Sequence, residues 1–421
     1  MRTTKRLLIG WVGVCCWTVA GAPVRAEGEA PKESTPAAPA TPSYPMTVPD
    51  ESAGDWAIDR FAGASSAGPE FFQGPARQAG GLGRPGSVAP APDGTVYIAT
   101  AAGVVEVAAD GTLRLVIGGG GSQVEGSPDQ VVGGGLAWNP KEKMLYLTGP
   151  NCIRRLVIKE DGSRVVEVVA GTPRKAGLED GPAKAATFTT VGNLCINSRG
   201  AIYFLDGRTY GECIRKLENG EVTTVTRNGR GGGRVDGPLA QAKFNLIGLG
   251  GNISLGEEDD VLYMADHWNF AARRIDIKNG QVTTVAGMLK PKEWRREKQT
   301  EIEKRYNGNA DGPAIAWASF NSGCAYCCFD PVHKALWAGG PDESRFRWVK
   351  DFWGKEGMVK TVIGAKGGDK WNKDGLGVPA DGVKLVWNSV CAVDAQGRAY
   401  LAASSDPNGV WRAYSRKEVK P

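Results

Sequence analysis

The chain has 421 residues, 59 of them glycine, and a formal net charge of +5 at pH 7. So small a charge on a chain of this length indicates neither a nucleic-acid-binding nor a membrane-surface protein. The glycines fall between runs rich in Val, Ile and Tyr, a pattern typical of turn-rich β structure rather than of disorder.

The N-terminus has the layout of a secretory signal peptide. Basic residues within the first six positions precede the apolar run 7–20, and Val24-Arg25-Ala26 suits cleavage after Ala26. We therefore expect residues 1–26 to be a cleaved signal; the alternative is an uncleaved membrane anchor. No other segment has the length of a membrane span. The mature protein is expected to be exported to a periplasm, a cell surface or the medium.

Residues 27–54 are rich in Pro, Ala, Glu and Ser. Such a composition cannot bury enough apolar surface to fold, so this segment is predicted to be a disordered linker. The first predicted strand, 56–63, follows it and stands apart from the repeats described next.

Three stretches nearly repeat one another: Asp180-Gly181-Pro182-Ala183, Asp236-Gly237-Pro238-Leu239 and Asp311-Gly312-Pro313-Ala314. Each is followed by an apolar run, a Gly- or Asp-marked turn and further strand-like sequence. A unit that recurs every roughly 50–75 residues indicates a stacked or radial β architecture.

Six such units can be traced. The predicted units, in chain order, span 87–116, 135–171, 192–225, 252–287, 327–362 and 390–414. In the third, four short strands are joined by tight turns that include Asn219-Gly220, and Asn-Gly between β-branched runs is a strong hairpin signal. Four antiparallel strands of this kind form a β-propeller blade.

The sixth unit lacks a fourth strand. The early strand 56–63 resembles the fourth-strand ending of the fourth unit, and Gly74-Pro75-Ala76 after it is a weakened copy of the Asp-Gly-Pro-Ala stretch. We expect this strand, around Ile58, to pair with the strand around Trp411 and so to remove the open edges of the ring.

These features resemble the NHL-repeat propellers, relatives of the regucalcin/gluconolactonase group. The resemblance rests on Asp-Gly-Pro-Ala (180–183), Ile-Arg-Lys-Leu (214–217), Leu-Tyr-x-Ala-Asp (262–266) and Val-Thr-Thr-Val-Ala-Gly (282–287). It implies an all-β fold over residues 55–417: a six-bladed β-propeller of four-stranded antiparallel blades, closed by the N-terminal strand. It implies no single activity, because the group includes binding scaffolds and enzymes.

Cleavage of the signal would leave seven cysteines, an odd number that argues against a complete disulfide framework. We expect buried, unreactive thiols. Cys324 and Cys327 have a Cys-x-x-Cys spacing, but no histidine follows the second cysteine. A structural role or an adventitious disulfide is the favoured interpretation, and a redox or metal role is the alternative. The only histidines, His267 and His333, are too few for a multi-histidine zinc site.

The candidate binding residues lie in loops between second and third strands, on the face that also carries the connections between blades. They are Arg208, Tyr210, His267, Trp268, Asn269 and Arg345. Aromatic and guanidinium groups are typical of recognition patches. The alternative is that these residues only cap strand ends.

The aspartates of the repeated stretch (Asp180, Asp236 and Asp311) are interpreted as structural. Asp before Gly-Pro favours a turn. We further predict that they pair with third-strand arginines such as Arg215 and Arg274 and staple adjacent blades.

The sequence therefore favours an exported, monomeric binding or scaffold module without a cofactor. Its partner would be a protein or a carbohydrate, not a nucleic acid, docked on the inter-blade loop face beside the charged insertion 290–307. The alternative, carried from the gluconolactonase relatives, is a Ca²⁺-dependent lactonase or hydrolase with Asn193, Asn252 and Asn388 at the central channel. No Glu near a first strand completes that set. A channel lined by Cys, Val, Ser and Leu would favour the binding module.

Overall fold

The computed structural model describes most of the predicted repeat region. The described residues are 56–63, 74–78, 82, 85–100, 103–118, 134–207, 213–227, 233–245, 252–287, 312–314, 320, 324–340, 346–350, 352, 357–363, 378–379, 388–403 and 409–415. The chain separates into two units, Met1–Thr41 and Pro42–Pro421, and every described residue lies in the second. The expected signal peptide, the linker and the insertion 290–307 lie outside the described residues.

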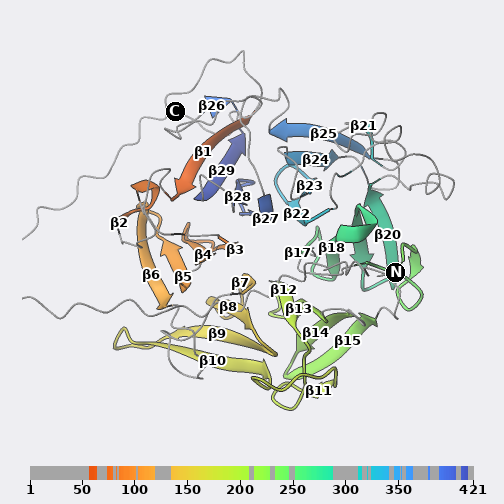
Figure 1. Ribbon diagram of the computed structural model, residues 1–421, viewed down its shortest axis with the longest axis horizontal. Coiled ribbons are helices and arrows are strands. Elements are labelled where there is room, and N and C mark those ends of the chain that lie inside the picture. Colours follow the sequence, from red (N-terminus) through yellow and green to blue (C-terminus); the bar gives the residue numbers. More distant parts are fainter. Residues whose placement is uncertain are drawn as a thin grey trace, which may run out of the picture. The chain divides into compact units, whose positions relative to one another are not determined.

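Six small antiparallel sheets are arranged around a centre, so the predicted six-bladed propeller is confirmed (Figure 1). The first strand of each blade lies innermost and contacts the first strands of both neighbouring blades. The first three blades, from inner to outer strand, are β3 (Ser87–Pro90), β4 (Val96–Thr100), β5 (Gly103–Val107), β6 (Thr112–Gly118); β7 (Leu136–Asn139), β8 (Met144–Gly149), β9 (Cys152–Ile158), β10 (Arg164–Gly171); and β12 (Val191–Ile196), β13 (Ile202–Asp206), β14 (Cys213–Glu218), β15 (Glu221–Arg227).

The remaining blades follow the same plan. They are β17 (Ile253–Leu255), β18 (Val261–Asp266), β19 (Ala271–Asp276), β20 (Gln281–Ala286); β22 (Tyr326–Asp330), β23 (Ala335–Gly339), β24 (Phe346–Lys350), β25 (Met358–Ile363); and β27 (Asn388–Val393), β28 (Ala399–Ala403), β29 (Gly409–Ser415), β1 (Trp56–Ala62). Two 3-10 turns also occur in the described chain, η1 (Ala76–Gln78) and η2 (His267–Asn269).

Five two-residue strands pair with the outer edge of a fourth strand. They are β2 (Gly74–Pro75), β11 (Gly181–Pro182), β16 (Gly237–Pro238), β21 (Gly312–Pro313) and β26 (Val378–Pro379). The repeated Gly-Pro stretch thus lies beside the strand that ends its own blade. The weakened copy at Gly74-Pro75 behaves as predicted, whereas Val378–Pro379 was not foreseen because it lacks the Asp-Gly signature.

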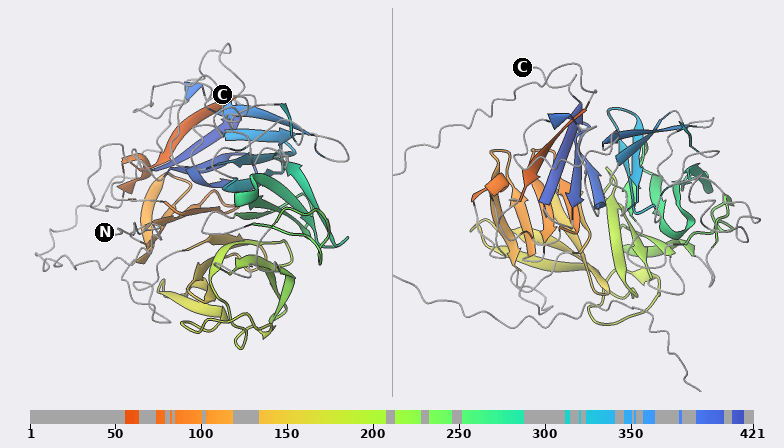
Figure 2. Two further views of the ribbon diagram at one scale, coloured as in Figure 1. Left: turned by 45° about the vertical axis from the view of Figure 1, so that its right-hand side comes forward. Right: turned by 45° about the horizontal axis from the view of Figure 1, so that its top comes forward.

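The N-terminal strand closes the ring, as predicted. β1 pairs antiparallel with β29, with Ile58 opposite Ala413 and Arg60 opposite Trp411. The views of Figures 1 and 2 show the two strands side by side although they come from opposite ends of the described chain. The buried carboxylate of Asp59 accepts a bond from Arg412 at 2.8 Å and reinforces the junction.

The core lies between the blades. Six clusters of buried apolar residues each combine side chains from two neighbouring blades. At the closing junction, for example, Ile98 and Val105 of the first blade pack with Val410 of the last. Burying one such aliphatic side chain is worth about 1.5–3 kcal/mol, so each blade is stabilised mainly by its neighbours.

Each second strand carries a buried aromatic residue at the same register position. These residues are Tyr97, Tyr146, Tyr203, Tyr263, Trp337 and Tyr400. Several direct their polar group to a carboxylate of a turn, as Tyr263 does to Glu257 at 2.8 Å. This position marks the repeat more consistently than the Asp-Gly-Pro stretch does.

Candidate functional site

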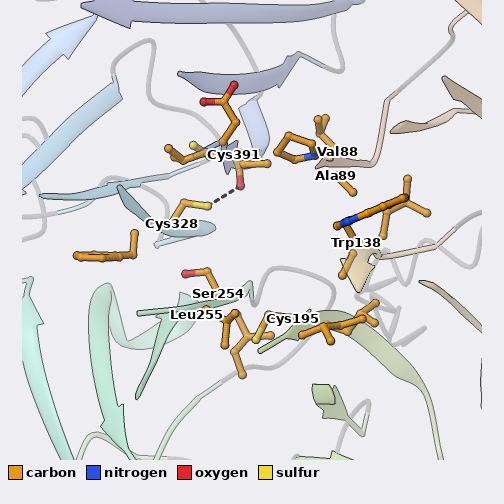
Figure 3. A pocket seen from close by; sticks show the side chains of 18 of the residues that line it. Val88, Ala89, Trp138, Cys195, Ser254, Leu255, Cys328 and Cys391 are labelled. Carbon is orange, nitrogen blue, oxygen red and sulfur yellow. Dashed lines mark hydrogen bonds between the residues drawn. The ribbon is translucent and has the colours of Figure 1, made fainter. Parts of the chain in front are cut away.

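A cavity of about 430 Å³ lies at the centre of the ring and is lined by residues from the first strands of all six blades. Figure 3 shows labelled side chains from several of these strands around a common space. They include Val88, Trp138, Cys195, Ser254 and Cys391. The cavity is therefore a product of the radial arrangement.

The lining is mainly apolar, with three thiols. Cys195, Cys328 and Cys391 lie on the first strands of the third, fifth and sixth blades, and the thiol of Cys328 donates to the backbone carbonyl of Cys391 at 3.0 Å. Burial raises the pKa of the Cys195 and Cys391 thiols well above the ordinary value. Because the thiolate is the nucleophilic form, these thiols are unsuited to nucleophilic catalysis.

The amides proposed for a calcium site are only partly brought together. Asn193 and Asn252 both line the cavity and come from neighbouring blades. Asn388 begins β27, and its side chain lies outside the described part. The carboxylate of Asp394, the acidic residue of the described lining, already accepts bonds from Arg398 at 2.6 Å and Tyr400 at 3.1 Å.

Within the described residues, no group of three or more His, Cys, Asp or Glu side chains could hold a metal ion. Calcium requires several oxygen ligands, carboxylates prominent among them. Ala and Pro are the commonest residues of the described lining, which also holds three Cys, three Leu, two Val and a single Ser.

The candidate residues His267, Trp268 and Asn269 form η2, in the loop between β18 and β19. Their turn is held by hydrogen bonds to two other segments, the connection 233–245 and the stretch that leads into β22. Trp268 N–H donates to the carbonyl of Asn245 at 3.1 Å, and the Asn269 amide donates to the carbonyl of Gly233 at 2.7 Å. The backbone N–H of Cys324 donates to the carbonyl of His267 at 3.3 Å.

This turn presents one large apolar side chain to solvent. Trp268 is 51 % exposed. Its ring meets the His267 ring edge-on, with the two ring centroids 5.2 Å apart. Asn269 is engaged internally, since its amide also donates to Asp266 at 2.8 Å. The other candidates, Arg208, Tyr210 and Arg345, lie outside the described residues.

The predicted aspartate–arginine pairs exist, with one wrong assignment. Arg215 pairs with Asp180 at 2.8 Å as predicted, but the partner of Asp236 is Arg273, at 2.6 Å. Arg274 points to the other face of its strand and pairs with Glu257. Successive residues of a strand face opposite sides, which explains the error.

The pairs also join different elements from those predicted. Asp180 lies in the connection that leads into the third blade and pairs with an arginine of that same blade. The contact therefore fixes the inter-blade connection to the blade that follows it. Asp311 lies outside the described residues.

The cysteines of the described chain are buried, as expected. These residues form no disulfide with one another: Cys152, Cys195, Cys213, Cys324, Cys327, Cys328 and Cys391. Burial raises the pKa of the Cys327 thiol well above its usual value. The Cys327 thiol therefore differs from the low-pKa thiolate of a redox motif.

The sequence did not identify Trp138 as a cavity residue. It lies on β7, and its ring stacks on Tyr97 of the first blade at 5.9 Å. The signal was present, because Trp138 stands in the first strand of the second unit, the strand that lines the centre of a propeller.

No helix among the described residues is long and apolar enough to cross a membrane. Neither a protein-family model nor a curated protein sequence matches the chain.

The chain is similar in fold to several solved structures. A protein of unknown function from Bacteroides thetaiotaomicron has a TM-score of 0.56 at 14 % identity, with 85 % of this chain and 75 % of that chain covered. An auxiliary nutrient binding protein from the same species has a TM-score of 0.56 at 12 % identity, with 86 % and 76 % covered. One from Bacteroides ovatus has a TM-score of 0.55 at 12 % identity, with 86 % and 77 % covered. These similarities support the propeller fold.

Proposed function

We propose that this propeller is an exported binding module that recognises a protein or carbohydrate partner through its inter-blade loop face. Trp268 is the anchor of the recognition surface. The observation that carries the proposal is a half-exposed tryptophan on a turn fixed by hydrogen bonds to two other segments. A pre-ordered aromatic side chain binds a partner with little loss of conformational entropy.

The chemistry of the central cavity supports a binding role over a hydrolytic one. Its described lining offers thiols with raised pKa values, two amides and one carboxylate that is already paired. General acid–base or metal-dependent hydrolysis needs a free titratable group or a set of oxygen ligands. Two of the proteins similar in fold are described as auxiliary nutrient binding proteins.

Substitution of the anchor tests the proposal. Trp268→Ala is expected to reduce partner binding at least tenfold, as loss of a buried aromatic contact does at protein interfaces. Val332→Ala is the control, because Val332 is also exposed (45 %) but lies in the turn between first and second strands, at the opposite end of the blade.

The probes are a panel of polysaccharides and the exported protein fraction of the source cells, passed over the immobilised full chain. Retention by the wild type and Val332→Ala but not by Trp268→Ala is the expected result. Equal retention by both variants would place recognition elsewhere. Lactone hydrolysis that depends on added calcium would contradict the proposal in favour of the enzyme alternative.

A further inference from the structure

The third strands of four successive blades carry an arginine at the same register position. These residues are Arg154, Arg215, Arg273 and Arg347, and each is at most 2 % exposed. A buried guanidinium keeps its charge and needs acceptors or counter-charges close by, because an isolated buried ion is strongly unfavourable.

The third and fourth blades supply two carboxylates to this arginine. Arg215 pairs with the buried Asp206 at 2.9 Å and with Asp180 at 2.8 Å. Arg273 pairs with the buried Asp266 at 2.6 Å and with Asp236 at 2.6 Å. The two arginines thus share one arrangement.

The outer of the two carboxylates lies at the surface. The side chains of Asp180 and Asp236 are 44 % and 47 % exposed. Each also accepts a hydrogen bond from a fourth-strand backbone N–H, that of Thr224 or Thr284, at 2.9 Å. An anion that reached this position from solvent would therefore meet both a guanidinium and an N–H group.

Among the described residues, the second blade supplies neither of these carboxylates. Gly149 occupies the end of β8, where the third and fourth blades have Asp206 and Asp266. A Cβ atom built on Gly149 would overlap Nη1 of Arg154, so the guanidinium lies over the glycine. Among the residues that the structure describes, no acidic side chain pairs with Arg154, and its Nε and Nη2 are buried without a hydrogen-bond partner.

Two acidic side chains of the second blade form ion pairs with a different arginine. Glu142 and Glu167 pair with the adjacent Arg155, each at 3.0 Å, on the other face of the strand. Nε is also unpaired in Arg215 and Arg273, so Nη2 is the atom that distinguishes Arg154. Within the described part of the chain, no surface carboxylate takes the place beside this nitrogen that Asp180 and Asp236 take beside Arg215 and Arg273.

A backbone N–H group and a lysine side chain also belong to the surroundings of Arg154. Val168 stands opposite Arg154 in the position of Thr224 and Thr284, so its backbone occupies the place of the second donor. The ammonium group of Lys184 donates to the carbonyl of Val168 and adds a second cation at the same edge of the blade.

We propose that Arg154, the backbone N–H of Val168 and Lys184 form an anion site that takes a carboxylate group of a ligand. The ligand carboxylate occupies the position that Asp180 and Asp236 fill in the next two blades. This inference is independent of the proposed role of Trp268. The matching internal carboxylates identify a carboxylate as the ligand chemistry.

The test measures the melting temperature of the full chain while sodium acetate replaces sodium chloride at constant ionic strength. The wild type is expected to gain about 2 °C or more at saturating acetate, because a ligand that binds only the folded state stabilises it. Arg154→Met is expected to lose this dependence. Arg155→Met, which removes the neighbouring arginine on the other face, is expected to keep it.

Gly149→Asp provides the converse test. Gly149 is absent from the glycines with positive φ, so other residues can adopt its backbone conformation. An aspartate there restores the internal carboxylate, with a small shift of the flexible Arg154 head. We expect a higher melting temperature than that of the wild type and a retained acetate dependence, because Asp206 and Asp266 pair with Nη1 of their arginines and the proposed ligand position faces Nη2. Loss of the dependence in this variant would place acetate at the internal position and would contradict the proposal. This variant keeps the proposal testable if Arg154→Met fails to fold.

The source of the carboxylate is distinguished by a second probe, the blocked peptide Asp-Gly-Pro-Ala of residues 180–183. Tighter binding of the peptide than of acetate would identify a protein side chain as the source. Stabilisation by acetate alone would identify a small organic acid. A wild-type chain that does not respond to either probe, or an Arg154→Met variant that responds equally, would overturn the proposal.

Discussion

Asp236 shows how one surface carboxylate can hold a buried cation. It accepts bonds from the guanidinium of Arg273 at 2.6 Å and from the backbone and hydroxyl of Thr284 at 2.9 and 3.0 Å. Bonds to charged groups are stronger than neutral ones, and their loss would leave one nitrogen of a buried guanidinium with weaker acceptors. The residue therefore stabilises the blade although it is half exposed.

Asp236→Ala is expected to lower the free energy of unfolding by about 1.5–3 kcal/mol, the range for hydrogen bonds to charged groups. Urea unfolding monitored by tryptophan fluorescence measures the change. Asp110→Ala is the control, because Asp110 is an exposed turn residue that accepts a bond only from Thr112 in the described chain. Equal losses in the two variants would contradict a specific role for the pair with Arg273.

The sequence prediction chose Arg274 instead of Arg273 as the partner of Asp236 because it considered the fourth unit by itself. Each of these arginines is adjacent to an apolar strand residue. The fourth unit alone therefore does not show which arginine faces Asp236. Alignment of Ala272-Arg273-Arg274-Ile275 with Ile214-Arg215-Lys216-Leu217 would have selected Arg273, because Arg215 occupies the same position. The information was in the repeat and not in the fourth unit alone.

At the level of the element, the blade is defined by alternation and by its turns. The strands were predictable because Val, Ile, Leu and Tyr runs alternate with Gly- and Asp-marked turns. The aromatic position of the second strand also recurs in the sequence, as in Ile202-Tyr203-Phe204 and Leu262-Tyr263-Met264. The loss of the internal carboxylate beside Arg154 was not predictable from the strand of Arg154 alone, because Gly149 of a different strand stands at that position.

The turn of the fourth blade contributes a pH-dependent stabilisation through Glu257. Burial alone would raise the pKa of Glu257, but bonds from its own backbone N–H and from Tyr263 and the pair with Arg274 outweigh burial and lower it. The folded-state pKa is therefore below the unfolded value of about 4.3. The stabilisation is complete above that pH and is lost as the pH falls through the folded value.

Glu257→Gln should flatten the decline of unfolding free energy below about pH 4, because the variant has no carboxylate to titrate. Urea unfolding between about pH 3 and pH 6 tests this expectation. Glu258→Gln alters the exposed neighbour and should retain the wild-type decline. If the unfolding free energy of Glu257→Gln declined at acid pH as steeply as that of the wild type, the assigned pKa shift would be contradicted.

For the whole molecule, closure of the ring is the feature on which the cavity and the loop face both depend. The closing strand comes from the start of the described chain and pairs with its end, so the last blade is complete only when both termini of the propeller meet. The sequence predicted this because the sixth unit lacked a strand and a strand without a unit preceded the first. The side chains that line the central cavity were harder to predict from the sequence, because they depend on which first-strand side chains face inward.

Hydrogen exchange of the closing strands tests the central claim most directly. If β1 is a structural strand of the sixth blade, amides in peptides covering 56–62 and 409–415 should exchange slowly, at one common rate set by opening of the propeller. Fast exchange in 56–62 with continued protection of 409–415 would show that the N-terminal strand does not close the ring.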